Sequence, residues 1–191
     1  MTTPAPDAGV RAARPADAAE LGRVHARAWA AAPPPLLPAP ADEAQLAQAW
    51  TAAVSAPPSS RHPVLVATAA DQVVGFAALA PSPDADAAAA EGSNAATSAG
   101  TDAELLVLLV DPDAVGRGHG SRLLNAGADV LADSGVRRLR TWVPEPDVER
   151  QRFLAGAGFA ADGATRVLDA TGDGSTTLRE IRMTVLLPER P

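Results

Sequence analysis

Apolar residues recur with two different periods along this chain of 191 residues. Within residues 15–30 and again within Asp42–Val54 they return every three or four positions, which predicts two amphipathic helices. Asp17 takes the N-cap position of the first helix, and Glu20 follows three residues later, as in a capping box. The prolines of residues 33–40 cannot continue a helix, so they separate the two.

Short runs rich in Val, Leu and Thr predict the strands. Val64–Thr68 and Val73–Leu79 flank a brief Ala-Asp turn, so we expect them to pair as an antiparallel hairpin. Ala103–Val110 is almost continuously apolar, which is typical of a central strand that is covered on both faces. Further strands are expected at Val10–Ala13, at residues 137–143 and in a terminal hairpin that turns at residues 172–174.

A third helix is predicted after Gly120 and a short fourth helix at Val148–Ala155. Gly135 is placed to end the third helix, since glycine readily adopts the left-handed conformation common after a helix C-terminus. The order of elements predicts an α+β fold in three layers, with helices flanking a mixed, mostly antiparallel sheet. The expected organisation is one domain at residues 10–187, a mobile loop within it at 81–101, and disordered ends at 1–9 and 188–191.

Composition narrows the classes of function. Because the chain has no Cys, it cannot form disulfides, thiolate zinc sites or a cysteine nucleophile. The net charge of −7 argues against general binding to nucleic acid, so any anion site must be local. No signal peptide and no apolar run of membrane-spanning length is apparent, which predicts a cytoplasmic protein without a membrane partner.

The segment VGRGHGSRLL places three alternating glycines between the central strand and the third helix. Unpaired N–H groups at a helix start bind anions, and glycine lets a phosphate approach the backbone closely. A Walker loop requires a lysine, and this chain has none. A dinucleotide-binding fingerprint has the spacing G-x-G-x-x-G in a parallel unit near the start of a domain, and fits poorly here.

The longer segment VDPDAVGRGHGSRLL resembles the coenzyme-A-binding motif of the GCN5-related N-acetyltransferases (the GNAT family), V-x-P followed by [QR]-x-x-G-x-[GA] and a helix. Val110 and Pro112 match V-x-P, and Gly118 and Gly120 match the two small positions. Val115 departs from the motif, because it occupies the [QR] position. Since this segment mainly offers backbone N–H groups, we expect the departure to weaken coenzyme binding rather than abolish it.

A second segment, DVERQRFLAGAGF, resembles the late motif of the same family, N-x-x-A-x-x-F-Y-x-x-x-G-F. Asp147 stands at the Asn position, Arg150 at the Ala position and Phe153 at the Phe position, and Gly158-Phe159 closes the motif. The resemblance extends over most of residues 10–187. It implies the GNAT fold, in which the sheet is splayed between the fourth and fifth strands.

The resemblance implies transfer of an acetyl group from acetyl-CoA to an amine, without a metal. We expect the acceptor to be a small-molecule amine, and dimerisation is common in the family, so a homodimer is one expectation. The thioester carbonyl should accept a backbone N–H of the Leu109–Val110 region, chiefly that of Val110. The residues expected to bind the coenzyme are Leu109, Val110, Val115, Gly116, Arg117, Gly118, His119, Gly120, Ser121, Asp147 and Phe153.

The groups that would move protons are less well defined. Glu104 is the candidate base, because some family members carry a catalytic glutamate there; the alternative is an exposed carboxylate at a strand end. The family's usual acid is a tyrosine, and this chain has Leu154 at that position and no Tyr anywhere. Water, Ser121 or the ammonium group of the substrate must then protonate the thiolate. His25 is a further, weaker candidate for the base.

Two other functions fit the same residues. A non-catalytic module that binds acyl-CoA would keep the glycine turn and tolerate both Val115 and Leu154. A nucleotide-binding protein unrelated to coenzyme A would use the turn for another phosphate. Binding of coenzyme A, and turnover with an amine, would separate the three.

Overall fold

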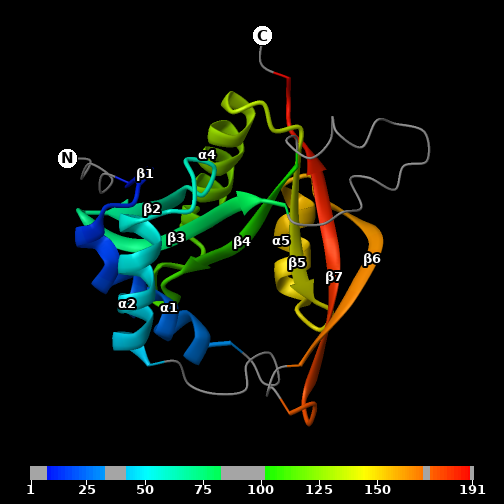
Figure 1. The fold of residues 1–191 in the computed structure, drawn as a ribbon, viewed down its shortest axis with the longest axis horizontal. Coiled ribbons are helices and arrows are strands. Elements are labelled where there is room, and N and C mark those ends of the chain that lie inside the picture. Colours follow the sequence, from blue (N-terminus) through cyan, green and yellow to red (C-terminus); the bar gives the residue numbers. More distant parts are fainter. Residues whose placement is uncertain (1–7, 33–41, 83–101, 170–172, 190–191) are drawn as a thin grey trace, which may run out of the picture. The chain divides into compact units, whose positions relative to one another are not determined.

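Seven strands form one sheet in the order β1-β2-β3-β4-β5-β7-β6 (Figure 1). The computed structural model describes residues 8–32, 42–82, 102–169 and 173–189. The strands are β1 (Ala8–Ala12), β2 (Val64–Ala69), β3 (Gln72–Pro81), β4 (Asp102–Val110), β5 (Arg138–Pro144), β6 (Ala160–Asp169) and β7 (Thr177–Leu186). The helices are α1 (Ala18–Ala30), α2 (Glu43–Ser55), α4 (His119–Asp133) and α5 (Val148–Gly156), with 3-10 turns η1 (Pro15–Asp17) and η3 (Pro112–Ala114).

The chain divides into two compact units. The first contains residues 1–33, 39–79 and 107–127, and the second contains residues 34–38, 80–106 and 128–191. The first unit therefore includes the glycine turn, and the second includes the late motif. The predicted single domain and its disordered ends remain predictions, although β1 already begins at Ala8.

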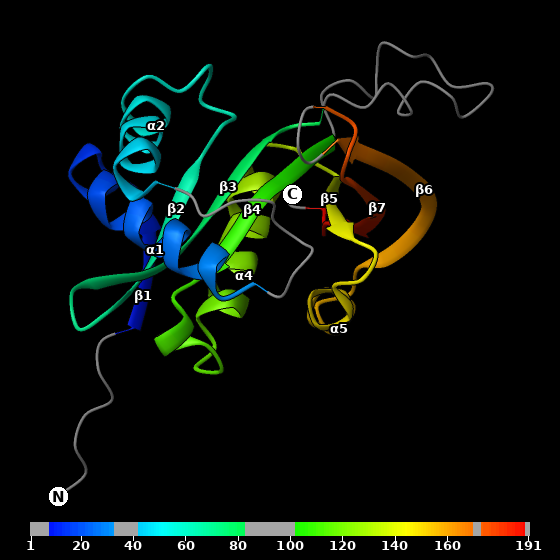
Figure 2. The same cartoon turned by 90° about the horizontal axis from the view of Figure 1, so that it is seen from below.

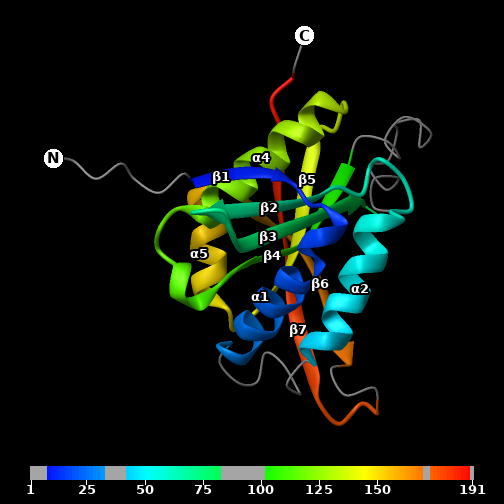
Figure 3. The ribbon, with the colours of Figure 1, turned by 90° about the vertical axis from the view of Figure 1, so that its left-hand side faces the viewer.

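The first unit has the three predicted layers. β1 and β3 both pair antiparallel with β2, and α1 and α2 lie side by side on one face of these strands (Figure 2, Figure 3). A core of Leu21, Val24, Val66, Val73 and Phe76 joins the helices to the sheet. The middle of α4 packs on the opposite face, where a Cβ added to Gly127 would lie 3.0 Å from Leu79 Cδ1. The hairpin expected at β2 and β3 is confirmed.

The start of α1 differs from the prediction. Asp17 precedes the helix, but its carboxylate makes no cap bond to the helix. It instead accepts the backbone N–H of Arg14 at 2.7 Å and two bonds from the guanidinium of Arg11. The predicted capping box is therefore wrong for α1, because a 3-10 turn intervenes and Asp17 closes that turn.

In the second unit, β7 lies between β5 and β6 and pairs antiparallel with both. The predicted terminal hairpin is thereby confirmed, although Gly172 of its turn lies outside the described residues. α5 lies on one face of these strands (Figure 2), and just after it a Cβ added to Gly158 would lie 3.6 Å from Val185 Cγ2 on β7. The start of β4 pairs in parallel with β5 through Asp102–Glu104 and Arg138–Arg140.

The pairing of β4 with β5 ends after Glu104, within a strand whose residues are all described. This is the predicted splay between the fourth and fifth strands, in a mixed and mostly antiparallel sheet. The expectation that β4 is covered on both faces is only half right. Asp102–Leu105 is buried, whereas Leu106 is 55% exposed and the rest of the strand is partly exposed. Residues 83–101, most of the predicted mobile loop, lie outside the described residues.

Candidate functional site

The glycine turn follows the end of β4 through the short η3 turn. Gly116 and Gly118 have φ angles of +78° and +80°, in the left-handed region that favours glycine. A Cβ added to Gly116 would meet no atom within 4 Å, so the backbone there is open. We call Val115–Ser121 the glycine cradle.

Helix α4 starts at His119, directly inside the glycine cradle. The first N–H groups of an α-helix have no partner within the helix and carry the positive end of its dipole. α4 is fifteen residues long, so its dipole is well developed. Open glycines followed at once by a helix start fit a diphosphate, which needs several backbone donors at close range.

Two arginines add positive charge to the glycine cradle. The guanidinium of Arg122 lies 3.7 Å from the position that a Cβ of Gly118 would occupy, and its Nη1 donates to the carbonyl of Arg117 at 3.2 Å. The side chain of Arg117 is exposed. Val115, at the position where the family has Gln or Arg, is 65% exposed, so no polar side chain comes from there.

The side chain of His119 is buried within the glycine cradle, since the residue is only 4% exposed. Its Nδ1 is buried and has no hydrogen-bond partner among the described residues. Burial lowers the pKa of the imidazole, and the charges of Arg122 and Arg117 lower it further. The ring is therefore neutral at pH 7.

The backbone of Leu109 and Val110 comes unusually close to Gly75 on β3. A Cβ added to Gly75 would lie 2.9 Å from the carbonyl oxygen of Leu109 and 3.3 Å from Cα of Val110. Any residue larger than glycine would collide with this backbone. The end of β4 thus has a defined position against β3, in the segment expected to hold the thioester carbonyl.

The remaining predicted site residues belong to the second unit. Glu104 is 7% exposed, which contradicts the alternative of an exposed carboxylate, and it lies in register with Arg140 on β5. Asp147 is the N-cap of α5, and its carboxylate accepts the N–H of Arg150 at 3.0 Å. Phe153 lies on α5 and is partly buried. Leu154, at the family's Tyr position, is 1% exposed.

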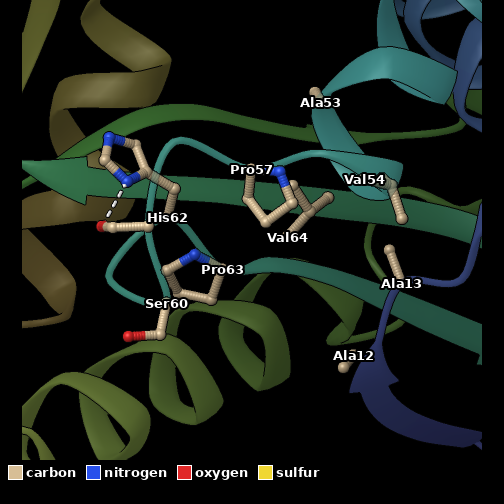
Figure 4. Close-up of a pocket in the computed structure, with 10 residues that line it drawn as sticks. Ala12, Ala13, Ala53, Val54, Pro57, Ser60, His62, Pro63 and Val64 are labelled. Carbon is tan, nitrogen blue, oxygen red and sulfur yellow. Dashed lines mark hydrogen bonds between the residues drawn. The ribbon is translucent and has the colours of Figure 1, made fainter.

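A pocket of about 200 Å³ opens at the start of β2, next to Ala12, Ala53 and His62 (Figure 4). His62 Nδ1 shares a hydrogen bond of 2.9 Å with Ser59 Oγ. The pocket lies at the opposite end of the strands from the glycine cradle, because Pro63 bonds to Leu79 whereas Asp111 bonds to Val74. It therefore contributes nothing to the phosphate site.

A profile of the acetyltransferase (GNAT) family matches residues 23–159, well over half of the chain. The chain belongs to this family. A search of curated proteins found no match. GNAT enzymes use acetyl-CoA as cosubstrate, so the protein is an acetyl-CoA-dependent acyltransferase.

Solved structures share the GNAT fold at low identity. The protein yncA of Salmonella typhimurium, provisionally described as an acetyltransferase and solved with acetyl-CoA, is 19% identical with a TM-score of 0.68, over 96% of this chain and 95% of that one. The ribosomal-protein-alanine N-acetyltransferase of Brucella melitensis is 23% identical with a TM-score of 0.68, over 94% and 99%. A protein provisionally described as a phosphinothricin N-acetyltransferase is 16% identical with a TM-score of 0.68, over 96% and 100%.

No helix in the described part of the chain is long and apolar enough to cross a membrane. Within residues 8–32, 42–82, 102–169 and 173–189, no three His, Cys, Asp or Glu side chains gather as metal ligands would. Sequence reasoning missed Gly75 and the contacts of Asp111 with α1. Both depend on pairs of residues that are distant in the sequence.

Proposed function

We propose that this GNAT enzyme transfers the acetyl group of acetyl-CoA directly to the amine of a small molecule. The observation that carries the proposal is the glycine cradle, in which two left-handed glycines lead straight into α4. Its backbone donors and the charges of Arg117 and Arg122 suit the diphosphate of coenzyme A. Asp147 and Phe153 are proposed as further coenzyme contacts on the strength of the late motif alone.

Acetyl-CoA supplies the acetyl group as a thioester when bound. We propose that the backbone N–H of Val110, beside Leu109, donates to the thioester carbonyl oxygen and stabilises the negative charge that develops there. The close approach of Gly75 supports this role, because it fixes the position of the donor before the substrate arrives.

Glu104 is the proposed base, which accepts a proton from the ammonium group of the acceptor. As the amine nitrogen forms its bond to the carbonyl carbon, the bond from carbon to sulfur breaks. The thiolate then takes a proton from water, from Ser121 or from the acceptor nitrogen itself, since Leu154 cannot donate one. General acid catalysis typically contributes about 10²–10⁴-fold, so the loss of the tyrosine lowers the rate without removing the reaction.

The acceptor is proposed to be a small amine in the cytoplasm, and the enzyme is proposed to act without nucleic acid or membrane. The names of the structural neighbours include both a protein acceptor and a small-molecule acceptor. The acidic chain favours a cationic amine over an anionic acceptor such as nucleic acid. Homodimerisation remains a prediction from the family.

Binding of coenzyme A to Gly118→Asp tests the glycine cradle, with Gly135→Asp as the matched control. Both glycines flank α4 and have nearly the same φ, +80° and +78°, so the two substitutions strain the backbone equally. Two negative charges about 4 Å apart near a protein surface repel by roughly 4 kcal/mol. We expect calorimetry to show coenzyme binding weakened more than about 100-fold in Gly118→Asp and unchanged in Gly135→Asp. Equal affinities in both variants would refute the site.

Release of free thiol from acetyl-CoA across a panel of amines tests catalysis separately. We expect turnover with at least one small amine, and a loss of about 10²–10⁴-fold in kcat for Glu104→Gln. Tight binding of coenzyme A with no turnover on any amine would favour the non-catalytic module instead.

A further inference from the structure

The carboxylate of Asp111 is buried where β4 ends, just before the η3 turn that leads into the glycine cradle. The residue is 5% exposed, although it is charged and lies in a connection between elements. Its Oδ1 accepts the N–H of Asp113 at 3.1 Å, which caps η3. Its own N–H donates to the carbonyl of Val74 on β3 at 2.8 Å. Through these two hydrogen bonds alone, Asp111 connects the end of β4 to β3 and to the η3 turn.

Two arginines from one face of α1 reach this carboxylate. Arg23 Nη1 lies 2.6 Å from Oδ2, and Arg27 donates from Nε to Oδ2 and from Nη2 to Oδ1, both at 3.1 Å. Arg23 also donates from Nη2 to the carbonyl of Val73. The pair from Arg27 is bidentate, a geometry that fixes the relative orientation of the two groups. We call Arg23, Arg27 and Asp111 the α1–β4 clasp.

The α1–β4 clasp sets two guanidinium charges against the one carboxylate of Asp111, and Arg27 also pairs with Asp113 at 2.6 Å. Burial opposes ionisation of Asp111, but the N–H of Asp113 and the guanidinium groups of Arg23 and Arg27 outweigh it and hold the pKa of the carboxyl below its usual value. The carboxylate therefore stays ionised at pH 7. Without its arginines it would be a buried negative charge five residues from Gly116, where the coenzyme diphosphate is proposed to bind.

We propose that Asp111 is a positioning residue for coenzyme binding, because the clasp sets the end of β4 and the entry to the glycine cradle relative to α1. The proposal rests on the proposed coenzyme site. On one side of this segment the clasp holds Asp111, and on the other Gly75 admits the backbone of Leu109 and Val110. The proposed oxyanion donor, the N–H of Val110, thus lies next to both constraints, and the η3 turn leads from Asp111 into the cradle.

Asp111→Asn tests the proposal, since asparagine keeps the shape and the bond to Asp113 but loses both ion pairs. Without the ion pairs, the backbone N–H groups at the end of β4 and in the glycine cradle are free to shift. They must then be ordered when the coenzyme binds, and the cost of that ordering lowers the affinity. We expect calorimetry to show coenzyme A binding weakened about tenfold. We also expect kcat to fall by at least as much, because small misplacements of reacting groups are costly.

Asp17→Asn is the matched control. Asp17 also lies in the first unit, accepts a bidentate arginine, Arg11, and accepts one backbone N–H, but it has no bond to β4. Both substitutions remove a buried carboxylate from its ion pair, so both lower the unfolding temperature. Only Asp111→Asn is expected to change the affinity for coenzyme A. Equal affinities of the two variants, in protein shown by circular dichroism to be folded, would overturn the positioning role.

Arg27→Met keeps the test decisive if Asp111→Asn does not fold. Arg27 is 43% exposed in its side chain, so methionine retains much of its packing while removing both bonds to Asp111 and the exposed ion pair with Asp113. We expect a loss of about threefold or more in coenzyme affinity, because the carboxylate of Asp111 is then less well neutralised. Wild-type affinity in Arg27→Met would contradict the proposal. Failure of the wild-type protein to bind coenzyme A would instead refute the proposed coenzyme site itself.

Discussion

His25 shows how one hydrogen bond fixes the state of a side chain. On α1, its Nδ1 accepts the indole N–H of Trp50 from α2 at 3.2 Å, so the ring proton must lie on Nε2. Its ring also contacts Trp29 and Phe76 edge to face, with ring centroids 4.6 Å and 5.8 Å away. Burial lowers its pKa below the ordinary value of 6.5. If Nδ1 were protonated, its N–H would face the indole N–H of Trp50, and the hydrogen bond between the two rings would be lost.

Stability should therefore fall at acid pH because of His25. The unfolded chain binds a proton to this histidine as the pH drops through about 6.5, while the folded chain does not, so unfolding becomes easier below that pH. Above about pH 6.5, the contribution of His25 to the free energy of unfolding no longer changes with pH. We expect urea denaturation to show a larger loss of unfolding free energy between pH 7.5 and 5.5 for the wild type than for His25→Gln.

Glutamine is the informative replacement because its side-chain oxygen can still accept the indole N–H of Trp50, yet it does not titrate. His62 and His119 remain in both proteins, so the difference between the two pH dependences isolates His25. The same dependence in wild type and His25→Gln would show that His25 is not the residue that couples protons to folding. The base role that the sequence left open for His25 also loses support, since its lone pair on Nδ1 is already engaged.

At the scale of elements, α1 and α2 cross at Gly22. A Cβ there would lie 2.8 Å from Ala47 N and 2.8 Å from the Glu43 carbonyl, and neither backbone atom can yield without moving the helix. Alanine gains about 1 kcal/mol in helix propensity over glycine, but overpacking costs about 1–3 kcal/mol. We expect Gly22→Ala to lower the free energy of unfolding by up to roughly 2 kcal/mol in urea denaturation.

Gly156→Ala provides the comparison, because Gly156 ends α5 and a Cβ there would meet nothing within 4 Å. Without a clash, only the propensity gain remains, so this variant should match or slightly exceed the wild type in stability. If Gly22→Ala is as stable as Gly156→Ala, the close crossing of α1 and α2 does not constrain the helices.

Turns and helix ends that are decided by residues close together in the chain could be predicted from the sequence. Gly135 ends α4 with a φ of +78°, and the Ala70-Asp71 turn joins β2 to β3 as expected, since turns are decided by neighbouring residues. The role of Asp17 was predicted wrongly because its partner, Arg11, precedes the helix. Arg23 and Arg27 have the spacing of a solvated face of α1, yet both bind Asp111, more than eighty residues away.

Of the candidate site, too, one part could be predicted from the sequence and another part could not. The glycine cradle is one continuous segment with its own sequence motif, so the order of its residues is enough to locate it. Nothing in an apolar run such as Ala103–Val110 indicates that Leu106 is exposed or that Leu109 faces a glycine on another strand. Those properties arise from pairing between strands, and a single sequence does not specify which strands pair or in what register.

At the scale of the whole molecule, two electrostatic effects on the coenzyme oppose each other. The chain carries a net charge of −7, which repels the phosphates of coenzyme A, whereas Arg117 and Arg122 at the glycine cradle attract them. The Debye length is about 10 Å at 0.1 M salt, so charges spread over the protein are largely screened already. Contacts within a few ångströms are screened much less, and the attraction should therefore dominate.

Affinity for coenzyme A should accordingly weaken as salt is added. We expect calorimetry to show a dissociation constant roughly threefold higher at 300 mM than at 50 mM sodium chloride. The double variant Arg117→Gln, Arg122→Gln should bind more weakly at low salt and depend less on salt, because only the repulsion of the acidic chain and the backbone donors remain. If binding tightens with salt in the wild type, net charge rather than the local arginines governs how this acidic protein meets its coenzyme.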